Sequence, residues 1–347
     1  MKSFLITCFC LGAMAFANAQ TDTVKIKVDE NTPENAYNKG LEFFKAKNYT
    51  EAINEFGKAI TLKADFEKAY YNRGLAYAEQ SKLNEAMADY NKSIELNPQA
   101  DYSFFSRAEA NTQLEKKTEA YADYSKATEI NVKHADAWYR RGVMDYEAKE
   151  YAKAVDDYTK AIEAKPDYAY AFNDRASAKL ELGKTDEAID DYKKAIAAAP
   201  SMPFSHNNLA SAYRKVKNYT AAIETYTKAI ELKKDYYIAY NNRGTAKLEN
   251  GDFKGALLDF TKAIELKNDY AFAYNNRASA NYKKQDYQAS VNDCNKAIGL
   301  NANYGEAYLN RGIAKEMLKD FKGACEDFKK ANSLGIERAK QYFDVCD

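Results

Sequence analysis

The sequence of 347 residues contains only two histidines, His134 and His206, and neither has a nucleophile or a metal ligand placed beside it. It has no Cys-x-x-Cys pair and no Cys/His grouping of the kind that holds zinc. It also has no Gly-rich loop that could cradle phosphate groups. Because these absences remove the usual sequence signs of catalysis, we expect a protein that is not an enzyme and binds neither a metal nor a cofactor.

An excess of charge of one sign is also lacking, because 51 basic residues are balanced by 51 acidic ones. A chain without net charge has no general electrostatic attraction for nucleic acid. After the first nineteen residues, no apolar run is long enough to predict a transmembrane segment. We therefore expect a protein or peptide partner, with no nucleic acid and no membrane span.

The N-terminal end differs in kind from the rest of the chain. Lys2 is followed by an uncharged run from Phe4 to Ala17 and by an A-x-A site ending at Ala19, which together predict a secretory signal peptide over residues 1–19. Cleavage there leaves Gln20 first, and residues 20–32 form a polar linker. The leader resembles those of Gram-negative envelope proteins. We expect export, most simply to the periplasm, with secretion or surface association as alternatives.

The most informative pattern is a small residue that recurs every 34 positions without insertion or deletion. The series is Gly40, Gly74, Ala108, Gly142, Ala176, Ala210, Gly244, Ala278 and Gly312. A strict period of this length indicates one supersecondary unit that is repeated and stacked. With the small residue at position 8, repeats 1 to 9 cover residues 33–66, 67–100, 101–134, 135–168, 169–202, 203–236, 237–270, 271–304 and 305–338.

Other positions of the repeat are equally regular. Positions 20 and 27 hold Ala or Ser in every copy, position 24 is aromatic in eight copies, and position 4 is aromatic in seven. Spacings of three, four and seven between these positions are helical. Small residues allow two antiparallel helices to approach closely, and we expect the rings of positions 4 and 24 to fill the remaining space. Each repeat is therefore predicted to be a helix, a short turn and a second helix.

This pattern resembles the tetratricopeptide repeat (TPR) family over residues 33–338. The resemblance implies an all-α fold, a right-handed solenoid of nine helix-turn-helix units. It also implies a concave groove that the first helices line through positions 2, 5, 6, 9, 12 and 13. A further helix over residues 337–347, after the break at Leu334-Gly335, is expected to cap the last repeat.

Position 7, usually Leu in that family, is Arg in seven copies, and position 23 is Asp in seven. The exceptions coincide, since repeat 1 has Lys with Glu and repeat 6 has Leu209 with Thr225. Such co-variation predicts contact between the two helices of each repeat, although a row of anion-binding arginines is an alternative. A Lys at position 26, three residues after the acid, predicts a solvated i,i+3 pair. The predicted structural bridges include Arg73 with Asp89 and Arg243 with Asp259.

Two positions of the expected groove carry residues that packing does not demand. Asparagine rows in family members bind the backbone of an extended peptide, because a carboxamide both donates and accepts; hydrogen bonds between repeats are an equally weighted alternative. Position 5 is aromatic in repeats 1 to 4 and Asn in repeats 5 to 8, which predicts apolar anchors followed by backbone-binding amides. The candidate groove residues are Asn38, Asn72, Asn173, Asn207, Asn208, Asn241, Asn242, Asn275, Asn276, Asn310, Tyr37, Tyr71, Phe105 and Tyr139.

Three cysteines remain after the leader, and export would place them in an oxidising compartment. Cys325 takes a core position of the last repeat, and Cys346 ends the expected cap, so we favour a disulfide between them over other pairings. Cys294 replaces an aromatic residue at position 24 and is expected to be a buried thiol.

Taken with the resemblance, these features predict a non-enzymatic scaffold of the cell envelope that binds extended protein segments along its groove. An envelope or surface protein that binds polysaccharide or peptidoglycan is the alternative, because Tyr and Asn side chains also suit sugars. A clamp for a C-terminal carboxylate would need cations in the groove, and Lys68, Arg140 and Arg214 support it weakly.

Overall fold

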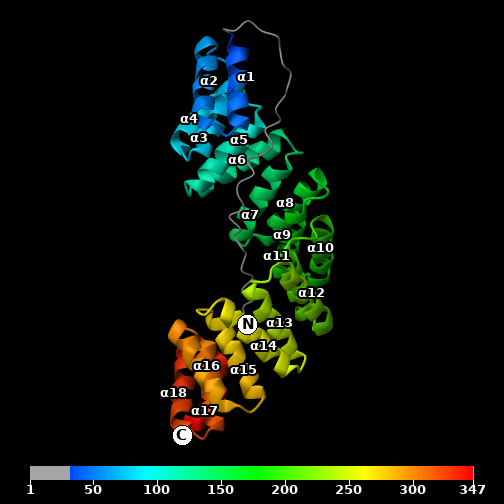
Figure 1. Ribbon diagram of the computed structural model, residues 1–347, viewed down its shortest axis with the longest axis vertical. Coiled ribbons are helices and arrows are strands. Elements are labelled where there is room, and N and C mark those ends of the chain that lie inside the picture. Colours follow the sequence, from blue (N-terminus) through cyan, green and yellow to red (C-terminus); the bar gives the residue numbers. More distant parts are fainter. Residues whose placement is uncertain (1–31, 347) are drawn as a thin grey trace. The chain divides into compact units, whose positions relative to one another are not determined.

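The computed structural model describes residues 32–346, so the predicted signal peptide and residues 20–31 of the predicted linker lie outside the described residues. Within that range the regular structure consists of eighteen α-helices and one 3-10 helix, with no strand. The chain divides into two compact units, an N-terminal unit up to Ala178 and a C-terminal unit from Lys179, and each is described by itself. Figure 1 shows the order of the helices along the chain.

Each repeat contributes two helices. In the N-terminal unit these are α1 (Pro33–Lys45), α2 (Tyr49–Leu62), α3 (Glu67–Glu79), α4 (Leu83–Leu96), α5 (Asp101–Gln113), α6 (Lys117–Ile130), α7 (Ala135–Glu147) and α8 (Tyr151–Ala164). The division at Ala178 falls inside α9 (Ala169–Glu181). The C-terminal unit continues with α10 (Thr185–Ala198), α11 (Pro203–Lys215), α12 (Tyr219–Leu232), α13 (Tyr237–Glu249), α14 (Phe253–Leu266), α15 (Ala271–Lys283), α16 (Tyr287–Leu300), α17 (Gly305–Met317), α18 (Phe321–Ser333) and η1 (Glu337–Cys346).

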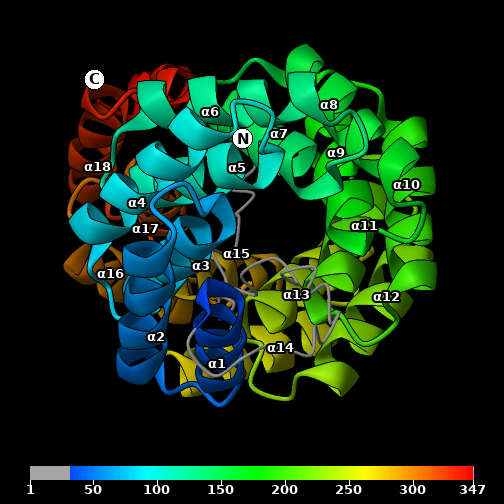
Figure 2. The ribbon, with the colours of Figure 1, turned by 90° about the horizontal axis from the view of Figure 1, so that it is seen from above.

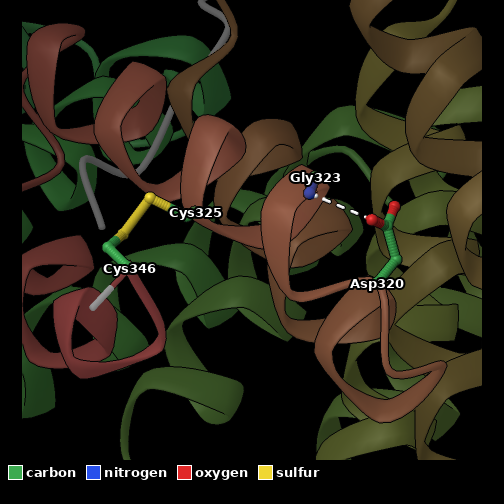
Figure 3. The surroundings of a disulfide bond; sticks show 4 residues. All are labelled: Asp320, Gly323, Cys325 and Cys346. Atoms are coloured by element: carbon green, nitrogen blue, oxygen red, sulfur yellow. Dashed lines mark hydrogen bonds between the residues drawn. A yellow bond between two sulfur atoms is a disulfide. The ribbon is translucent and has the colours of Figure 1, made fainter.

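The turn between the two helices of a repeat is the same in all nine copies. Position 15 has a positive φ throughout, whether it is Gly183 (77°), Gly251 (86°) or a residue with a side chain such as Lys217 (60°). The amide of position 16 then bonds the carbonyl of position 11, as in Asn218 to Tyr213 at 2.9 Å, which ends the first helix in a Schellman turn. In repeats 6 to 9, position 16 also caps the second helix. Asp320 Oδ1, for example, accepts from the amide of Gly323 at 3.0 Å (Figure 3).

The core of each repeat lies where position 8 meets position 24. A Cβ added at Gly74 would lie 2.7 Å from Tyr90 Cε1, so this close approach requires the small residue that the sequence repeats. The ring of Tyr90 is contacted by Tyr71 at position 5, with centroids 6.2 Å apart, and the same pairing recurs between Phe105 and Tyr124. Our expectation that position 4 supplies the partner ring was therefore wrong, because the position 4 rings lie against arginines.

Neighbouring repeats pack through small residues on the first helices. In each unit, successive first helices lie side by side and the second helices form a layer behind them (Figure 2). Ala246, at position 10, packs on Ala222 and Tyr226 of the preceding repeat. Repeat 1 departs from this pattern, since Asn35 stands at position 3, where repeats 2 to 9 have buried Ala or Ser, and exposed Glu42 stands at position 10. Polar residues thus mark α1 as the N-terminal end of the array.

The other end of the array is covered by η1, a 3-10 helix where we expected a helix over 337–347. It packs on α18, where Tyr342 stacks on Phe328 with centroids 4.9 Å apart and Ala339 is fully buried. Cys325 and Cys346 are joined by a disulfide, which ties η1 to α18 (Figure 3). Cys294 is a buried free thiol, and burial raises its pKa to about 12. In the described range, none of the helices is both long and apolar enough to cross a lipid bilayer.

Candidate binding surface

The arginines of position 7 and the aspartates of position 23 meet between the two helices of a repeat. Arg73 donates from Nε to Asp89 Oδ2 at 2.8 Å and from Nη2 to Oδ1 at 2.7 Å. The same two-bond geometry joins Arg107 with Asp123, Arg141 with Asp157, Arg243 with Asp259, Arg277 with Asp293 and Arg311 with Asp327. The aspartate side chains are only 4–9% exposed. These guanidinium forks are occupied within the protein.

Two further groups complete the arrangement around these arginines. The guanidinium lies over the ring of position 4, with distances to the centroid from 4.6 Å at Trp138 to 5.6 Å at Tyr70. Its Nη1 donates to position 25 of the preceding repeat, as in Arg243 to Thr227 at 3.0 Å. We call the four groups of positions 7, 23, 4 and preceding 25 the arginine junction. The equivalent acceptors elsewhere are Asn91, Ser125, Thr159, Thr261 and Asn295.

Repeat 6 lacks all four groups together. Leu209 replaces the arginine, Thr225 the aspartate and His206 the ring, and Lys193 replaces the acceptor at position 25 of repeat 5. The replacements at Leu209, Thr225 and His206 are visible in their columns of the sequence, but the one at Lys193 was missed. The position 25 column holds Gly, Asn, Ser or Thr wherever an arginine follows it, and could have revealed this partner. The structure therefore extends a pairwise co-variation to a group of four.

The lysines elsewhere follow a different rule from the one we expected. Lys160 at position 26 pairs with Glu163, three residues later, at 2.8 Å, and not with the acid three residues before it. Lys92, Lys126, Lys228 and Lys262 do the same. In repeat 1 the predicted i,i+3 pair does form, between Glu55 and Lys58. The bridge predicted between Lys39 and Glu55 does not, and Lys39 is exposed. These exposed pairs contribute little to stability.

The asparagines of the C-terminal unit form hydrogen-bonded rows from repeat to repeat. Asn242 Nδ2 donates to Asn207 Oδ1 at 3.1 Å, and Asn276 donates to Asn241 at 2.9 Å. Asn310 continues the pattern by donating to Asn275 at 2.9 Å. Position 6 of each repeat thus bonds position 5 of the preceding one. The position 5 amides are buried, whereas those of position 6 are partly exposed.

In the N-terminal unit the same link uses tyrosine hydroxyls. Asn72 donates to Tyr37 at 2.9 Å, and the Tyr139 hydroxyl donates to Asp174 at 2.8 Å. Two of the four rings that we proposed as groove anchors belong to the core, since Tyr71 is 8% and Phe105 is 7% exposed. Our expectation of exposed aromatic hot spots was therefore wrong for these two, whereas Tyr37 is partly exposed. The two units also differ in the inter-repeat bond, which uses tyrosine hydroxyls here and asparagine amides in the C-terminal unit. Asn38 and Tyr139 are partly exposed, and Asn173 is buried.

Charged residues interrupt the amide column in repeats 4 and 5. Phe105 has no hydroxyl to offer, and Arg140 forms an ion pair with Glu109, with Nε 3.1 Å from Oε1. Asp174 accepts from the Tyr139 hydroxyl and from Asn173 Nδ2 at 2.9 Å, and burial raises its pKa. His134, which the sequence left without a partner, lies 3.0 Å from Asp101 Oδ2, and its ring contacts Phe105. Among residues 32–346, no group of three or more His, Cys, Asp or Glu residues could hold a metal.

Family models match most of the repeat array. A model described as "TPR repeat" matches residues 40–81, and models described as "Tetratricopeptide repeat" match 67–99, 135–168, 169–202, 203–236 and 241–305. The chain belongs to the tetratricopeptide repeat family. As a TPR protein it has the all-α solenoid fold that its residues predict, on a scaffold that is generally non-catalytic and supports protein interaction. No curated protein matches this TPR chain.

Several solved structures share the fold. The C-terminal part of a TPR repeat-containing protein from Cytophaga hutchinsonii aligns with a TM-score of 0.57 at 18% identity, covering 69% of this chain and 98% of that one. A tetratricopeptide repeat protein from Parabacteroides merdae aligns with a TM-score of 0.50 at 21% identity, covering 72% and 98%. A chain of the APC/C hetero-tetramer Cut9-Hcn1 gives 0.57 at 14% identity, covering 90% and 75%. At these identities the likeness concerns the fold.

Proposed function

We propose that this TPR protein is an envelope scaffold that binds extended protein segments along its first helices. The proposal rests chiefly on the partly exposed position 6 amides of Asn242 and Asn276. Each is held in place by a bond to the preceding repeat, which spends one N–H of the carboxamide. A second N–H of the same group can donate to a peptide carbonyl. The inter-repeat bond and the peptide-binding role are thus compatible, because the first orients the group for the second.

Peptide backbone is the ligand that such a row suits best. An amide side chain satisfies a peptide group whatever side chain that peptide residue carries, and its orientation is fixed before the ligand arrives. Position 9 adds hydroxyls in the C-terminal unit, where Ser211 and Thr245 bond the carbonyls of Asn207 and Asn241 in their own helices at 3.0 Å. Positions 5, 6 and 9 of repeats 6 to 9 carry no charge, which favours main-chain recognition there over the reading of charged side chains. Arg214 and Glu249, at positions 12 and 13, form an ion pair with each other at 2.8 Å.

An envelope location is part of the proposal. It is supported by the predicted signal peptide over residues 1–19 and by the disulfide between Cys325 and Cys346, because disulfides persist in oxidising compartments. Mass spectrometry of the protein from its native host should find Gln20 as the first residue. A mature chain that retains residues 1–19 would contradict export.

The binding proposal is tested on an array of extended peptides, with glycan and peptidoglycan fragments as a second arm. Changing Asn242 and Asn276 to Ala should weaken peptide binding about tenfold. The matched control changes Asn207 and Asn241 to Ala, which breaks the same two inter-repeat bonds from the buried side. Equal loss in both variants would mean that the amides only position the repeats. Glycan binding without peptide binding would favour the polysaccharide function instead.

A further inference from the structure

The contact between α10 and α11 lacks the arginine junction, because all four of its positions carry other residues. From repeat 2 to repeat 9, position 25 accepts a hydrogen bond from the next arginine at six junctions. Between repeats 1 and 2 the acceptor is missing at Gly57, but Arg73 keeps its aspartate and its ring. Between repeats 5 and 6 every member of the arginine junction is replaced.

The residues that replace the arginine junction make their polar contacts within their own helix or in the adjoining turn. These contacts do not join α11 to α10. Lys193 is half-exposed and lies 3.8 Å from Asp190 in its own helix. The Thr225 hydroxyl donates to the carbonyl of Ala221 at 2.7 Å, one turn back in α12. His206 Nε2 bonds the Pro200 carbonyl at 3.0 Å, in the turn that directly precedes α11. Lys215 does cross the junction, from Nζ to the Leu180 carbonyl at 3.2 Å, but at its edge and from an exposed residue.

Packing inside repeat 6 is kept. Leu209 is 6% exposed and Tyr226 is fully buried, so α11 and α12 retain an apolar contact. Replacing a buried ion pair by an apolar residue is often neutral for the element that contains it. The replacement removes the hydrogen bond that an arginine at position 7 of α11 would donate to position 25 in α10. The replacements therefore weaken the contact between two repeats and leave each repeat intact.

We infer that the array opens at the contact between α10 and α11 more readily than at the neighbouring contacts, and that α11, once it has lost this contact, frays as the end helix of an array does. In a stack of nearest-neighbour units, one weak interface concentrates the opening at that place. Such an opening would let the first helices of repeats 5 and 6 adjust to a bound segment.

Hydrogen exchange of the full chain, with its disulfide intact, tests this inference without any ligand. Amides of α11 should exchange about tenfold faster than those of α13, which holds a complete arginine junction. The variant Lys193→Thr/Leu209→Arg/Thr225→Asp, which copies residues 227, 243 and 259, should remove most of that difference. Equal exchange in α11 and α13 of the unmodified protein would overturn the inference.

A second variant, which makes the reverse replacements and is called the mirror variant, tests the inference even if the first variant does not fold. Thr227→Lys/Arg243→Leu/Asp259→Thr transfers the residues of the weak contact to the contact between α12 and α13. Exchange in α13 should then rise about tenfold while α11 is unchanged. Unchanged exchange in α13 of a folded mirror variant would show that these residues do not control opening, and would also overturn the inference.

Discussion

Lys217 and Gly251 occupy the same turn position of adjacent repeats and share a left-handed backbone, with φ of 60° and 86°. A residue with a Cβ is strained there, whereas glycine is not. We expect Lys217→Gly to stabilise the protein by about 0.5 to 1 kcal/mol, after allowing for the greater freedom of glycine in the unfolded chain. The thermal unfolding midpoint measures this effect. Lys228→Gly, inside α12, is the control and should cost about 1 kcal/mol.

The bridge between Arg243 and Asp259 should behave differently when one partner or both are removed. Arg243→Leu leaves a buried carboxylate whose remaining cation is Lys247, with Nζ 2.8 Å from Asp259 Oδ2. We expect it to cost about 2 to 4 kcal/mol. The double variant Arg243→Leu/Asp259→Thr, which copies repeat 6, should cost clearly less. Denaturant unfolding of the single and double variants gives both values, and additive losses would contradict this account of the bridge.

Asp174 makes stability depend on pH. Burial raises its pKa above the usual 3.8, so its charged form is disfavoured in the folded protein. The penalty is absent below the unfolded value and develops as the pH rises through the folded one. Asp174→Asn, which restores the residue common at position 6, should raise the unfolding midpoint at pH 7 and have little effect near pH 3. An equal effect at both pH values would show that charge is not the cause.

The disulfide should matter most at the end of the array. It closes a loop with a sequence separation of 21, which corresponds to about 3 kcal/mol in the chain-entropy model. Cys346→Ser should therefore make η1 and α18 more accessible to limited proteolysis, with little effect on α13. Cys294→Ala is the matched control, because this buried thiol takes no part in the bond. Proteolysis that is unchanged in Cys346→Ser would contradict a role in holding the cap.

Much of the fold is readable from the sequence because the repeat provides nine observations of every position. Small residues at positions 8, 20 and 27 predict close helix packing, and the exceptions at Leu209 and Thr225 point to a charged contact. The turn is harder, because position 15 varies between Lys, Ser, Glu, Gln and Gly while its backbone does not change. Several residue types tolerate this left-handed conformation at a small cost in free energy. The residues found at position 15 therefore indicate it only weakly.

The candidate binding surface was predicted less well than the fold, because position in the repeat does not show whether a side chain is buried. Tyr71 and Asn241 stand on the groove side of their helices by position, and only the packing shows that both are buried. Whether a polar side chain bonds a neighbouring repeat or a ligand depends on differences of a few tenths of an ångström in the distance between donor and acceptor. The periodicity of the sequence gives no information on such distances. Asn276 illustrates this, because its bond to Asn241 joins positions 35 residues apart.

The two ends of the array have a consequence for how such a chain can change over evolution. A repeat added before α1 would have to pack on Asn35 and Glu42, and one added after α18 would have to displace η1 and its disulfide. Duplication or deletion of an internal repeat meets neither obstacle. Internal repeats carry a buried Ala or Ser at position 3, and Ala at position 10 except for Met144 in repeat 4. Relatives of this protein should therefore differ in length by multiples of 34 residues gained or lost from the interior, with both terminal repeats kept.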